Sequence, residues 1–514
     1  MLEEVAVLSR RRVLGGFAAT AALAALSACG GGERGSGSGG VLTIAYPEQP
    51  NSLDPAKANQ AYAIFLQAAY ASLINRRPDG SLAPGLATSW RYVGEGNRKF
   101  ELTLREGVRF SDGELLTADG VKKHFDYLIS AAGPQANALT GAVATVTGPS
   151  TVVLDLKEPN PVVPDMLTNE APLGSVISPK GLAAPAQLVT VSAGAGPYQL
   201  DPAQTLAGDR YTYVPNPHYS GPGTRHYEKV VIKIMANPNA AMNALRARQV
   251  DVVVGQYASV PSAKEARMQI KHTPVVFLGL ILSDRDGVKL PPLKDLRVRQ
   301  AINFAIDRES VARALVGEYG VATEQTVLPG TDGYVPENKD FYRYDPERAK
   351  QLLREAGYGA GFTMPVLTTT FANTMSEVLS DQLGKVGIKL DLHNVDGNAY
   401  FRDLAAGTYP AVSVGYGGQS IWLEGKGLFG PDALFNGMRT HSPELTSLYE
   451  RAAGADPETR AGLDRQIEDF LVKQAWFAPV LFTPVFYFAQ PEVNGIELSP
   501  RAPLPSLLDW HPAK

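Results

Sequence analysis

The sequence predicts an α/β fold in which helices cover β-sheets. Short apolar segments bounded by Gly, Pro, Asn or Asp alternate with longer segments whose apolar residues recur every three or four positions. Some of the longer segments open on a capping residue followed by proline, which is typical of a helix start. No repeat with a period of about 20 to 50 residues is visible, which argues against a solenoid. Mixed elements of this kind indicate sheets packed against helices.

Strands and helices alternate through the first half of the chain. Val41–Tyr46 is an apolar strand that ends at Pro47, and the apolar spacing predicts a helix over Tyr62–Ile74. Further predicted strands are Lys99–Leu104, Thr151–Leu156, Tyr211–Val214, Val230–Met235 and Val250–Val254, and further predicted helices are Ala118–Ala131 and Ala240–Arg248.

Helix signals are clear in the second half of the chain. The clearest helix is Pro346–Ala356, because Asp345 is a capping residue, proline takes the first turn and Gly357 stops the helix. Other predicted elements are a helix over Asp295–Val316, two helices within Glu444–Val472 split near Gly454–Pro457, and a strand over Ala478–Phe488.

Composition limits the classes of function. The 514 residues are 44% hydrophobic and 19% charged, which is typical of a globular chain of two to four domains. With 48 basic and 52 acidic residues there is no polycationic face for nucleic acid. The chain has a single cysteine, Cys29, which is too few for a disulfide framework or a cysteine-ligated metal site. We expect no cofactor, no metal and no nucleic-acid partner.

The N-terminus is typical of an exported protein. Arg10, Arg11 and Arg12 precede an apolar segment, Val13–Leu26, of about 14 residues, which is shorter than the ~20 that span a bilayer. We therefore predict a signal peptide over residues 1–28. Ser9–Leu14 also resembles a twin-arginine export signal, although three arginines fit any positively charged signal.

Cys29 is predicted to carry lipid. Leu26–Cys29 resembles the bacterial lipobox, in which the cysteine thiol receives diacylglycerol, and Gly30–Gly40 is a Gly/Ser-rich tether. Two or more acyl chains anchor a protein stably. The sequence therefore predicts a lipid-anchored protein at the outer face of the bacterial cytoplasmic membrane, with 29–40 as its tether. The alternative is an ordinary buried cysteine.

A series of motifs, in order, is similar to one family of binding proteins. The motifs are Leu53–Pro55, Tyr70–Leu73, Pro84–Trp90, Phe100–Gly113, Gly194–Tyr198, Asn216–Tyr219, Arg297–Ala301 with Ala305–Arg308, and Tyr344–Glu347 with Leu352–Leu353 and Ala356–Tyr358. Together they resemble the extracellular solute-binding proteins of the oligopeptide, dipeptide and nickel class, family 5, which serve ABC importers. Ala195 stands where the family usually has threonine.

The resemblance implies a two-lobed, periplasmic-binding-protein-like fold with a hinge and an inserted extra domain. Carried over to this chain, the first lobe takes 41–72, 190–280 and 485–514. The inserted domain takes 73–189 and the second lobe takes 281–484. Hinge closure would expel water from a ligand between the lobes and strengthen its polar contacts.

The resemblance also implies a function and partners. The protein would capture an oligopeptide-like solute and deliver it to an ABC permease, with a lipid anchor as its only link to the membrane. No GxxxxGK[ST] loop is present, so the ATPase would be a separate chain. We expect a monomer.

The ligand is expected to contact Tyr416, Gly418, Gln419, Trp422, Phe277 and Gln49. In peptide-binding members an aspartate after an aromatic holds the ligand's α-ammonium, and Gln419 stands at that position here. A neutral amide offsets the desolvation of an ammonium poorly. We therefore predict a ligand that is N-blocked, cyclic, sugar-like or otherwise not cationic at the group that meets Gln419. The alternative is that Gln419 is an ordinary loop residue that does not correspond to the family's aspartate. Tyr416 and Trp422 suit stacking, but each could be a packing residue.

Three alternatives stay open. A secreted hydrolase is disfavoured because no GxSxG or HExxH motif is present. Capture of an oligosaccharide or a metal chelate remains possible within the family, although the seven histidines form no close pair. A structural or adhesin role would give no thermal stabilisation by added solutes.

Overall fold

The structure is a computed structural model that describes residues 40–131, 133–134, 139–221, 225–417 and 420–513. These residues belong to one compact unit. The predicted signal peptide, Cys29 and the tether up to residue 39 lie outside the described residues. Below, first lobe, inserted domain and second lobe denote the ranges given above.

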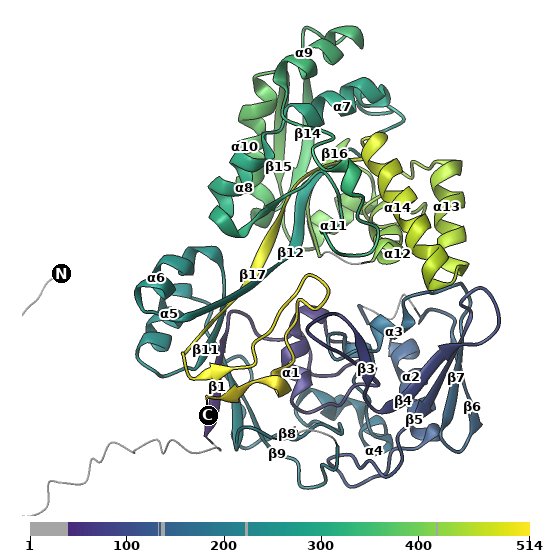
Figure 1. The fold of residues 1–514 in the computed structure, drawn as a ribbon, viewed down its shortest axis with the longest axis vertical. Helices are drawn as coiled ribbons and strands as arrows, with labels where there is room; N and C mark the ends of the chain where they lie inside the picture. Colours follow the sequence, from purple (N-terminus) through teal and green to yellow (C-terminus); the bar gives the residue numbers. More distant parts are fainter. Residues whose placement is uncertain (1–39, 132, 135–138, 222–224, 418–419, 514) are drawn as a thin grey trace, which may run out of the picture. The chain divides into compact units, whose positions relative to one another are not determined.

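One eleven-stranded sheet runs through both lobes, in the order β15-β14-β16-β12-β17-β11-β1-β10-β9-β8, with β13 paired to β17 (Figure 1). Its strands are β1 (Val41–Tyr46), β8 (Tyr198–Leu200), β9 (Arg210–Pro215), β10 (Lys229–Ile234), β11 (Val252–Gly255), β12 (Gln269–Ile281), β13 (Val321–Ala322), β14 (Phe362–Thr368), β15 (Ile388–Asn394), β16 (Ala411–Gly417) and β17 (Phe477–Ala489). The antiparallel pair β12 and β17, each of 13 residues, joins the two groups of strands.

The two long strands change partners near their middle. Pro274 lies opposite Pro484, and the register shifts before Val276. Beyond this point β12 pairs with β16 of the second lobe, whereas the other half of β17 pairs with β11 of the first lobe. A proline has no N–H to donate to a strand ladder, so the crossing between the lobes is a weak point of the sheet.

Helices cover the sheet in both lobes (Figure 1). The first lobe holds α1 (Ala63–Gln67), α5 (Pro238–Arg246) and α6 (Val260–Glu265). The second lobe holds α7 (Leu296–Phe304), α8 (Arg308–Val316), α9 (Pro346–Glu355), α10 (Thr370–Gly384), α11 (Asn398–Ala405), α12 (Ile421–Glu424), α13 (Pro443–Gly454) and α14 (Pro457–Lys473). Apolar side chains from helices and strands pack into shared clusters in each lobe, as expected for layered α/β cores.

Residues 73–189 contain a separate antiparallel sheet and its own core. The sheet has the order β4-β5-β7-β6, and its strands are β4 (Ala87–Tyr92), β5 (Lys99–Leu104), β6 (Val143–Gly148) and β7 (Thr151–Asp155). Helix α2 (Ala118–Ala131) covers it, and Phe100, Phe110 and Phe125 are fully buried in its core. The hairpin β2 (Ile74–Arg76) and β3 (Leu82–Pro84) and the short helices α3 (Val163–Met166) and α4 (Pro179–Leu182) complete this part.

The predicted α/β class and most predicted elements are confirmed, but two helices were predicted too long. The helix at Tyr62–Ile74 is only α1, because the carbonyls of Ala68 and Ala69 accept hydrogen bonds from Tyr198 and Gly196 instead of continuing the helix. The helix at Asp295–Val316 is two helices, α7 and α8, since Asp307 breaks the turn and caps α8 by accepting a hydrogen bond from the Ser310 amide.

Near the C-terminus, β18 (Val493–Asn494) pairs with β19 (His511–Pro512).

Across the described ranges of the chain, no helix combines the length and the apolar character that a membrane span requires.

Candidate functional site

The strand register brings the carboxyl end of β1 to the crossing between the lobes. β17 enters the first lobe at the crossing, and β11 runs antiparallel to it, with Gly255 opposite Phe486 and Val252 opposite Ala489. The carboxyl end of β11 therefore lies nearest the crossing. β1 is parallel to β11, so Tyr46 at its carboxyl end faces the same way.

The second lobe presents the same kind of edge from the other side. β16 is antiparallel to β12, and Gly417 pairs with Val276 next to the crossing, whereas Val412 pairs with Ile281 further away. β14 is parallel to β16, and β15 is parallel to β14, so their carboxyl ends also lie toward the crossing. In open α/β sheets, ligands bind outside the carboxyl ends of the strands. The candidate site is therefore the space between these two edges.

Tyrosines and a carboxylate mark the edge of the first lobe. The Tyr46 hydroxyl donates to the carbonyl of Ala61 at 2.7 Å, and the Tyr62 hydroxyl donates to the exposed carboxylate of Glu48 at 3.0 Å. The rings of Tyr46 and Tyr62 are 6.3 Å apart, and Tyr46 packs edge-on against Phe65 at 5.2 Å. This arrangement offers aromatic surface and one negative charge to a ligand.

Two exposed phenylalanines mark the edge of the second lobe. Phe371, in the first turn of α10 after β14, is 62% exposed, and Phe401 on α11 is 51% exposed. Phe371 lies against Gly415, where an added Cβ would stand 2.5 Å from its ring carbon Cε1. The carboxylate of Asp396 accepts from the amide and hydroxyl of Thr370, and these bonds hold the pKa of Asp396 below its usual value. An exposed phenylalanine ring that follows the carboxyl end of a strand is available to pack against a ligand.

The structure places Tyr416 and Phe277 on the face of the sheet that packs into the second lobe. They lie opposite each other in the β12–β16 pair. Phe277 is 1% exposed and packs against Phe482 at 6.1 Å. The Tyr416 ring packs against Phe435 at 5.7 Å, and burial raises its pKa. Because side chains alternate along a strand, Gly415 and its neighbour Phe371 occupy the opposite face.

Trp422 and Gln49 lie apart from this pair, and Gly418 and Gln419 lie outside the described residues. Trp422, on α12, is buried in the apolar cluster of the inserted domain, although it belongs to the second lobe. Tyr449 holds it by donating to its carbonyl at 2.8 Å. Gln49 is exposed in the loop after β1, near Gly208.

Polar contacts also join the second lobe to the remainder of the chain. Lys426 forms an ion pair with Glu158 of the inserted domain at 2.7 Å. The Asn97 amide donates to the carbonyls of Ala453 and Ala455. Arg501, near the C-terminus, forms an ion pair with Asp332 at 3.0 Å. Together with the burial of Trp422, these contacts hold the second lobe against the inserted domain and against the C-terminal part of the first lobe.

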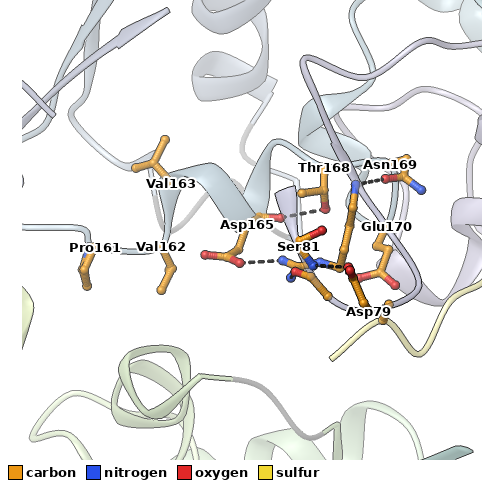
Figure 2. Close-up of polar contacts among 12 residues, drawn as sticks. Asp79, Ser81, Pro161, Val162, Val163, Asp165, Thr168, Asn169 and Glu170 are labelled. Carbon is orange, nitrogen blue, oxygen red and sulfur yellow. Dashed lines mark hydrogen bonds and ion pairs between the residues drawn. The ribbon is translucent and has the colours of Figure 1, made fainter. Parts of the chain in front are cut away.

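A charged network lies in the inserted domain beside the second lobe. Arg76 on β2 forms ion pairs with Asp165 and with Glu170, its Nε lying 3.1 Å from the Glu170 carboxylate. The Leu504 amide also donates to Glu170, and burial raises the pKa of this carboxyl to about 7. Figure 2 shows Asp165, Asn169 and Glu170 next to Asp79 and Ser81 of the β2–β3 turn.

The segment that leads into this network faces the second lobe. In Figure 2 the side chains of Pro161 and Val162 point toward the pale green ribbon of the second lobe. Arg460 of α14 donates to the Pro161 carbonyl at 2.9 Å. The network around Arg76 thus fixes a loop that the second lobe contacts directly.

Two buried carboxyl groups, one of them on α12, share one hydroxyl. Thr326 Oγ1 lies 2.8 Å from Glu424 Oε2 and 2.8 Å from Glu468 Oε2. A hydroxyl has a single proton to donate, so it cannot donate to two carboxylates at once. One of the two carboxyls therefore donates a proton to Thr326. Burial raises the pKa of Glu468 to about 7, which agrees with a proton held in this pair.

The sequence analysis missed Phe371, Phe401 and Glu48. The signal for Phe371 and Phe401 would have been the parallel strands β14 and β15, since each phenylalanine follows the carboxyl end of one of them. Among the described residues, no group of three or more Asp, Glu, His or Cys side chains gathers that could hold a metal ion.

The family model for bacterial extracellular solute-binding proteins, family 5 Middle, matches residues 81–425. The chain belongs to this family. The predicted resemblance is therefore confirmed, and family 5 is an extracellular family.

Relatives of this family 5 protein cover most of its length. A Brucella ovis protein named as a peptide-binding protein of an ABC transporter is 30% identical over 384 residues, which are 69% of this chain and 70% of that protein. The dipeptide-binding protein of Escherichia coli K12 is 26% identical over 458 residues, which are 81% of this chain and 84% of that protein.

Solved structures share the fold. The substrate-binding protein CtaP of Listeria monocytogenes matches with a TM-score of 0.79 and 22% identity, over 93% of this chain and 100% of that chain. DppA of Helicobacter pylori, in complex with a peptide, matches with a TM-score of 0.75 and 20% identity over 93% of this chain and 99% of that chain. The two-lobed, periplasmic-binding-protein-like α/β fold is thereby confirmed.

Proposed function

We propose that this family 5 protein is the substrate-binding component of an ABC importer and captures a peptide or peptide-like solute between its lobes. The observation that carries the proposal is the pair of facing carboxyl edges, one with Tyr46, Tyr62 and Glu48 and the other with Phe371. The names of relatives in Brucella and Escherichia support a peptide ligand. Hinge closure at the β12–β17 crossing would enclose the ligand and hand it to a membrane permease with a separate ATPase.

The carboxylates at the two edges bear on how the site receives a ligand amine. Gln419 replaces the aspartate expected there, so its side chain supplies no charge to an ammonium. Glu48 and Asp396 are carboxylates at the two facing edges, and they supply negative charge from positions other than 419. We infer that a free ligand amine, where present, is received by one of these two groups, and that Gly418 and Gln419 contact the ligand through neutral hydrogen bonds.

Isothermal titration with matched peptides tests the function. Free tri- to pentapeptides and the same peptides with acetylated amines are titrated into the protein. Saturable binding with one ligand per chain is expected, and Phe371→Ala should weaken it about tenfold, because burying a phenylalanine against a ligand contributes on the order of 1–2 kcal/mol. The matched control is Phe341→Ala, which removes another exposed phenylalanine of the second lobe, 37% exposed.

The outcomes separate the ligand classes. If Glu48→Gln or Asp396→Asn lowers the affinity for free peptides, the carboxylate that was replaced is the one that receives the amine. Equal binding of free and acetylated peptides means that no ammonium is recognised. If neither set binds and a chelate or an oligosaccharide does, the peptide proposal is wrong and the alternative solute is correct.

Membrane attachment is a separate part of the proposal. Cys29 would carry the lipid and 29–40 would be the tether, with the folded part acting as a monomer outside the cytoplasmic membrane. In cells, Cys29→Ser should move the protein from the membrane fraction to the soluble fraction, and labelled palmitate should no longer be incorporated. Membrane retention of the variant would contradict the anchor. We propose that this protein binds its solute and catalyses no reaction.

A further inference from the structure

Helix α12 and the turn that follows it, residues 421–429, carry contacts from the second lobe to the inserted domain (Figure 1). Trp422 and Leu423 pack into the apolar core of the inserted domain. Lys426 forms an ion pair with Glu158 at 2.7 Å, and its ammonium lies 5.5 Å from the centre of the Trp422 ring. A shift of this short segment would therefore loosen the second lobe from the inserted domain.

The last residue of α12 is tied to the interior of the second lobe through its carboxyl group. Glu424 is 1% exposed, and Glu468 of α14 is 0% exposed. The Thr326 hydroxyl lies 2.8 Å from an oxygen of each, and the Thr326 amide donates to Glu468 at 2.7 Å. Because one hydroxyl donates to only one acceptor, a proton on one of the two carboxyl groups completes this set of hydrogen bonds. That proton joins α12 to α14.

Loss of the proton would put two negative charges on either side of one threonine. No lysine or arginine among the described residues forms an ion pair with Glu468. Like charges at this distance repel strongly, and a buried charge without a partner is costly. The repulsion is relieved when one carboxylate moves toward water. Glu424 is the one free to do so, because α12 has four residues, whereas α14 has 17 and packs through Ile467 and Leu471.

Other titratable and charged groups face this pair from the elements packed around it. They are Tyr416 of β16, Lys426 after α12, Tyr449 of α13, Arg460, Asp464, Arg465 and Asp469 of α14, and Asp332 with Arg501 beside the loop that follows Thr326. Burial raises the pKa of both tyrosines, so they stay neutral near neutral pH. Burial also raises the pKa of Asp464 to about 6, and Arg460, 3.8 Å away, opposes the rise. Asp464 therefore has to be tested beside the pair.

We propose that the proton held between Glu424 and Glu468 is a switch for the contact between the second lobe and the inserted domain. With the proton bound, α12 keeps Trp422 in the core of the inserted domain. Without it, α12 moves and the contact opens. Burial raises the pKa of Glu468 to about 7, so the contact is favoured on the acidic side and weakens as the pH rises through neutrality. Any effect on ligand capture rests on the proposed function, whereas the switch itself needs no ligand.

Distances between two spin labels in the ligand-free full chain measure the switch. Lys123→Cys on α2 and Ser447→Cys on α13 give one exposed label on each side of the contact, and Cys29→Ser removes the native cysteine. From about pH 5 to about pH 8 the equilibrium constant for opening should rise by up to about 100-fold, because the closed form holds the proton more tightly than the open form. The distance distribution should then shift to longer values at the higher pH.

Variants identify the group that titrates. Glu468→Gln keeps an acceptor for the Thr326 amide and supplies N–H groups in place of the proton, so the distances should stay short at both pH values. Glu424→Gln, which neutralises the other member of the pair, should act in the same way. Asp464→Asn should still open with rising pH. Glu458→Gln, an exposed change on the same helix as Glu468, is the matched control and should also open. Circular dichroism confirms that each variant is folded.

Three outcomes would overturn the switch. The first is a distance distribution that does not change with pH in the unmodified protein. The second is an equal lengthening in Glu468→Gln and Glu424→Gln. The third is a change that only Asp464→Asn abolishes, which would place the titrating group at the Arg460 pair. Since no ligand is present, failure of the peptide proposal would leave these results unaffected.

Discussion

Pro274 and Pro484 lie directly opposite each other where the two longest strands pass from one lobe to the other. Neither residue has an N–H, so neither donates to the ladder that joins β12 to β17. The register shift that follows at Val276 interrupts the pairing further. These two prolines give the hinge of this protein a physical basis, since bending at this point breaks few hydrogen bonds.

Replacing both prolines should stiffen the hinge. In Pro274→Thr/Pro484→Thr two N–H groups become available to the ladder, and a hydrogen bond contributes about 1 kcal/mol, or about fivefold in an opening equilibrium. Hydrogen exchange of the amides at 275–278 and 483–486 should slow by about this factor. Pro365→Thr, within β14, is the control and should leave these amides unchanged. Equal exchange in all three proteins would mean that the prolines do not set the hinge.

Trp422→Ala should open the lobes rather than unfold one of them. Loss of a buried tryptophan costs about 3–5 kcal/mol, and here the contact joins the second lobe to the core of the inserted domain. Small-angle X-ray scattering of the ligand-free variant should show a larger radius of gyration. Trp476→Ala is the matched control, because Trp476 is equally buried but lies within the second lobe. It should lower the melting temperature and leave the radius unchanged, and the opposite pattern would contradict the assignment.

Stability should fall as the pH rises through 7. The pKa of Glu468 is raised from 4.5 to about 7 by burial, with a further increase from Asp469, so the folded state holds a proton that the unfolded state releases. The contribution of Glu468 to the free energy of unfolding is fully present below about pH 4.5 and is lost as the pH rises through the folded-state pKa. The loss amounts to up to about 3 kcal/mol. Glu170, at about 7, and Asp464, at about 6, act in the same direction.

Urea unfolding at about pH 5 and about pH 8 measures this effect. Glu468→Gln keeps an acceptor for the Thr326 amide, which now donates to Glu468 at 2.7 Å, and removes the titration. The variant should lose less stability between the two pH values than the unmodified protein. Glu458→Gln changes an exposed residue of the same helix and should behave like the unmodified protein. An identical pH dependence in all three would show that the proton is held elsewhere.

Gly415→Ala should weaken ligand binding with little effect on stability. The new methyl would stand 2.5 Å from the Phe371 ring, and this exposed ring can swing away from the strand at low cost. Binding should fall about as far as in Phe371→Ala, and the double variant should be no weaker than either alone, because both changes remove one contact. Gly384→Ala, where an added Cβ meets nothing within 4 Å, is the control. Additive losses in the double variant would mean that Gly415 contacts the ligand itself.

The sequence predicted an element correctly where its capping residues, its end signals and its apolar spacing all indicated the same element. Asp345 accepts from the Arg348 amide and caps α9, as the Asp-Pro start and Gly357 stop predicted. The split of the last two helices and the strand at β17 are confirmed for the same reason. Local signals failed at Tyr62–Ile74, where backbone groups of Ala68 and Ala69 pair with residues more than 100 positions away.

The sequence by itself determined the α/β class and the family, because helix starts, strand patterns and ordered motifs are written in neighbouring residues. Only the tertiary structure decided which aromatic side chains are buried within the lobes and which are exposed at their facing edges. Strand alternation turns Tyr416 and Phe277 into the second lobe, and Trp422 is buried against the inserted domain. Phe371 lies against Gly415 of β16 because β14 pairs in parallel with β16, with the two strands more than 40 residues apart in sequence. Such pairing depends on long-range register, which no local pattern records.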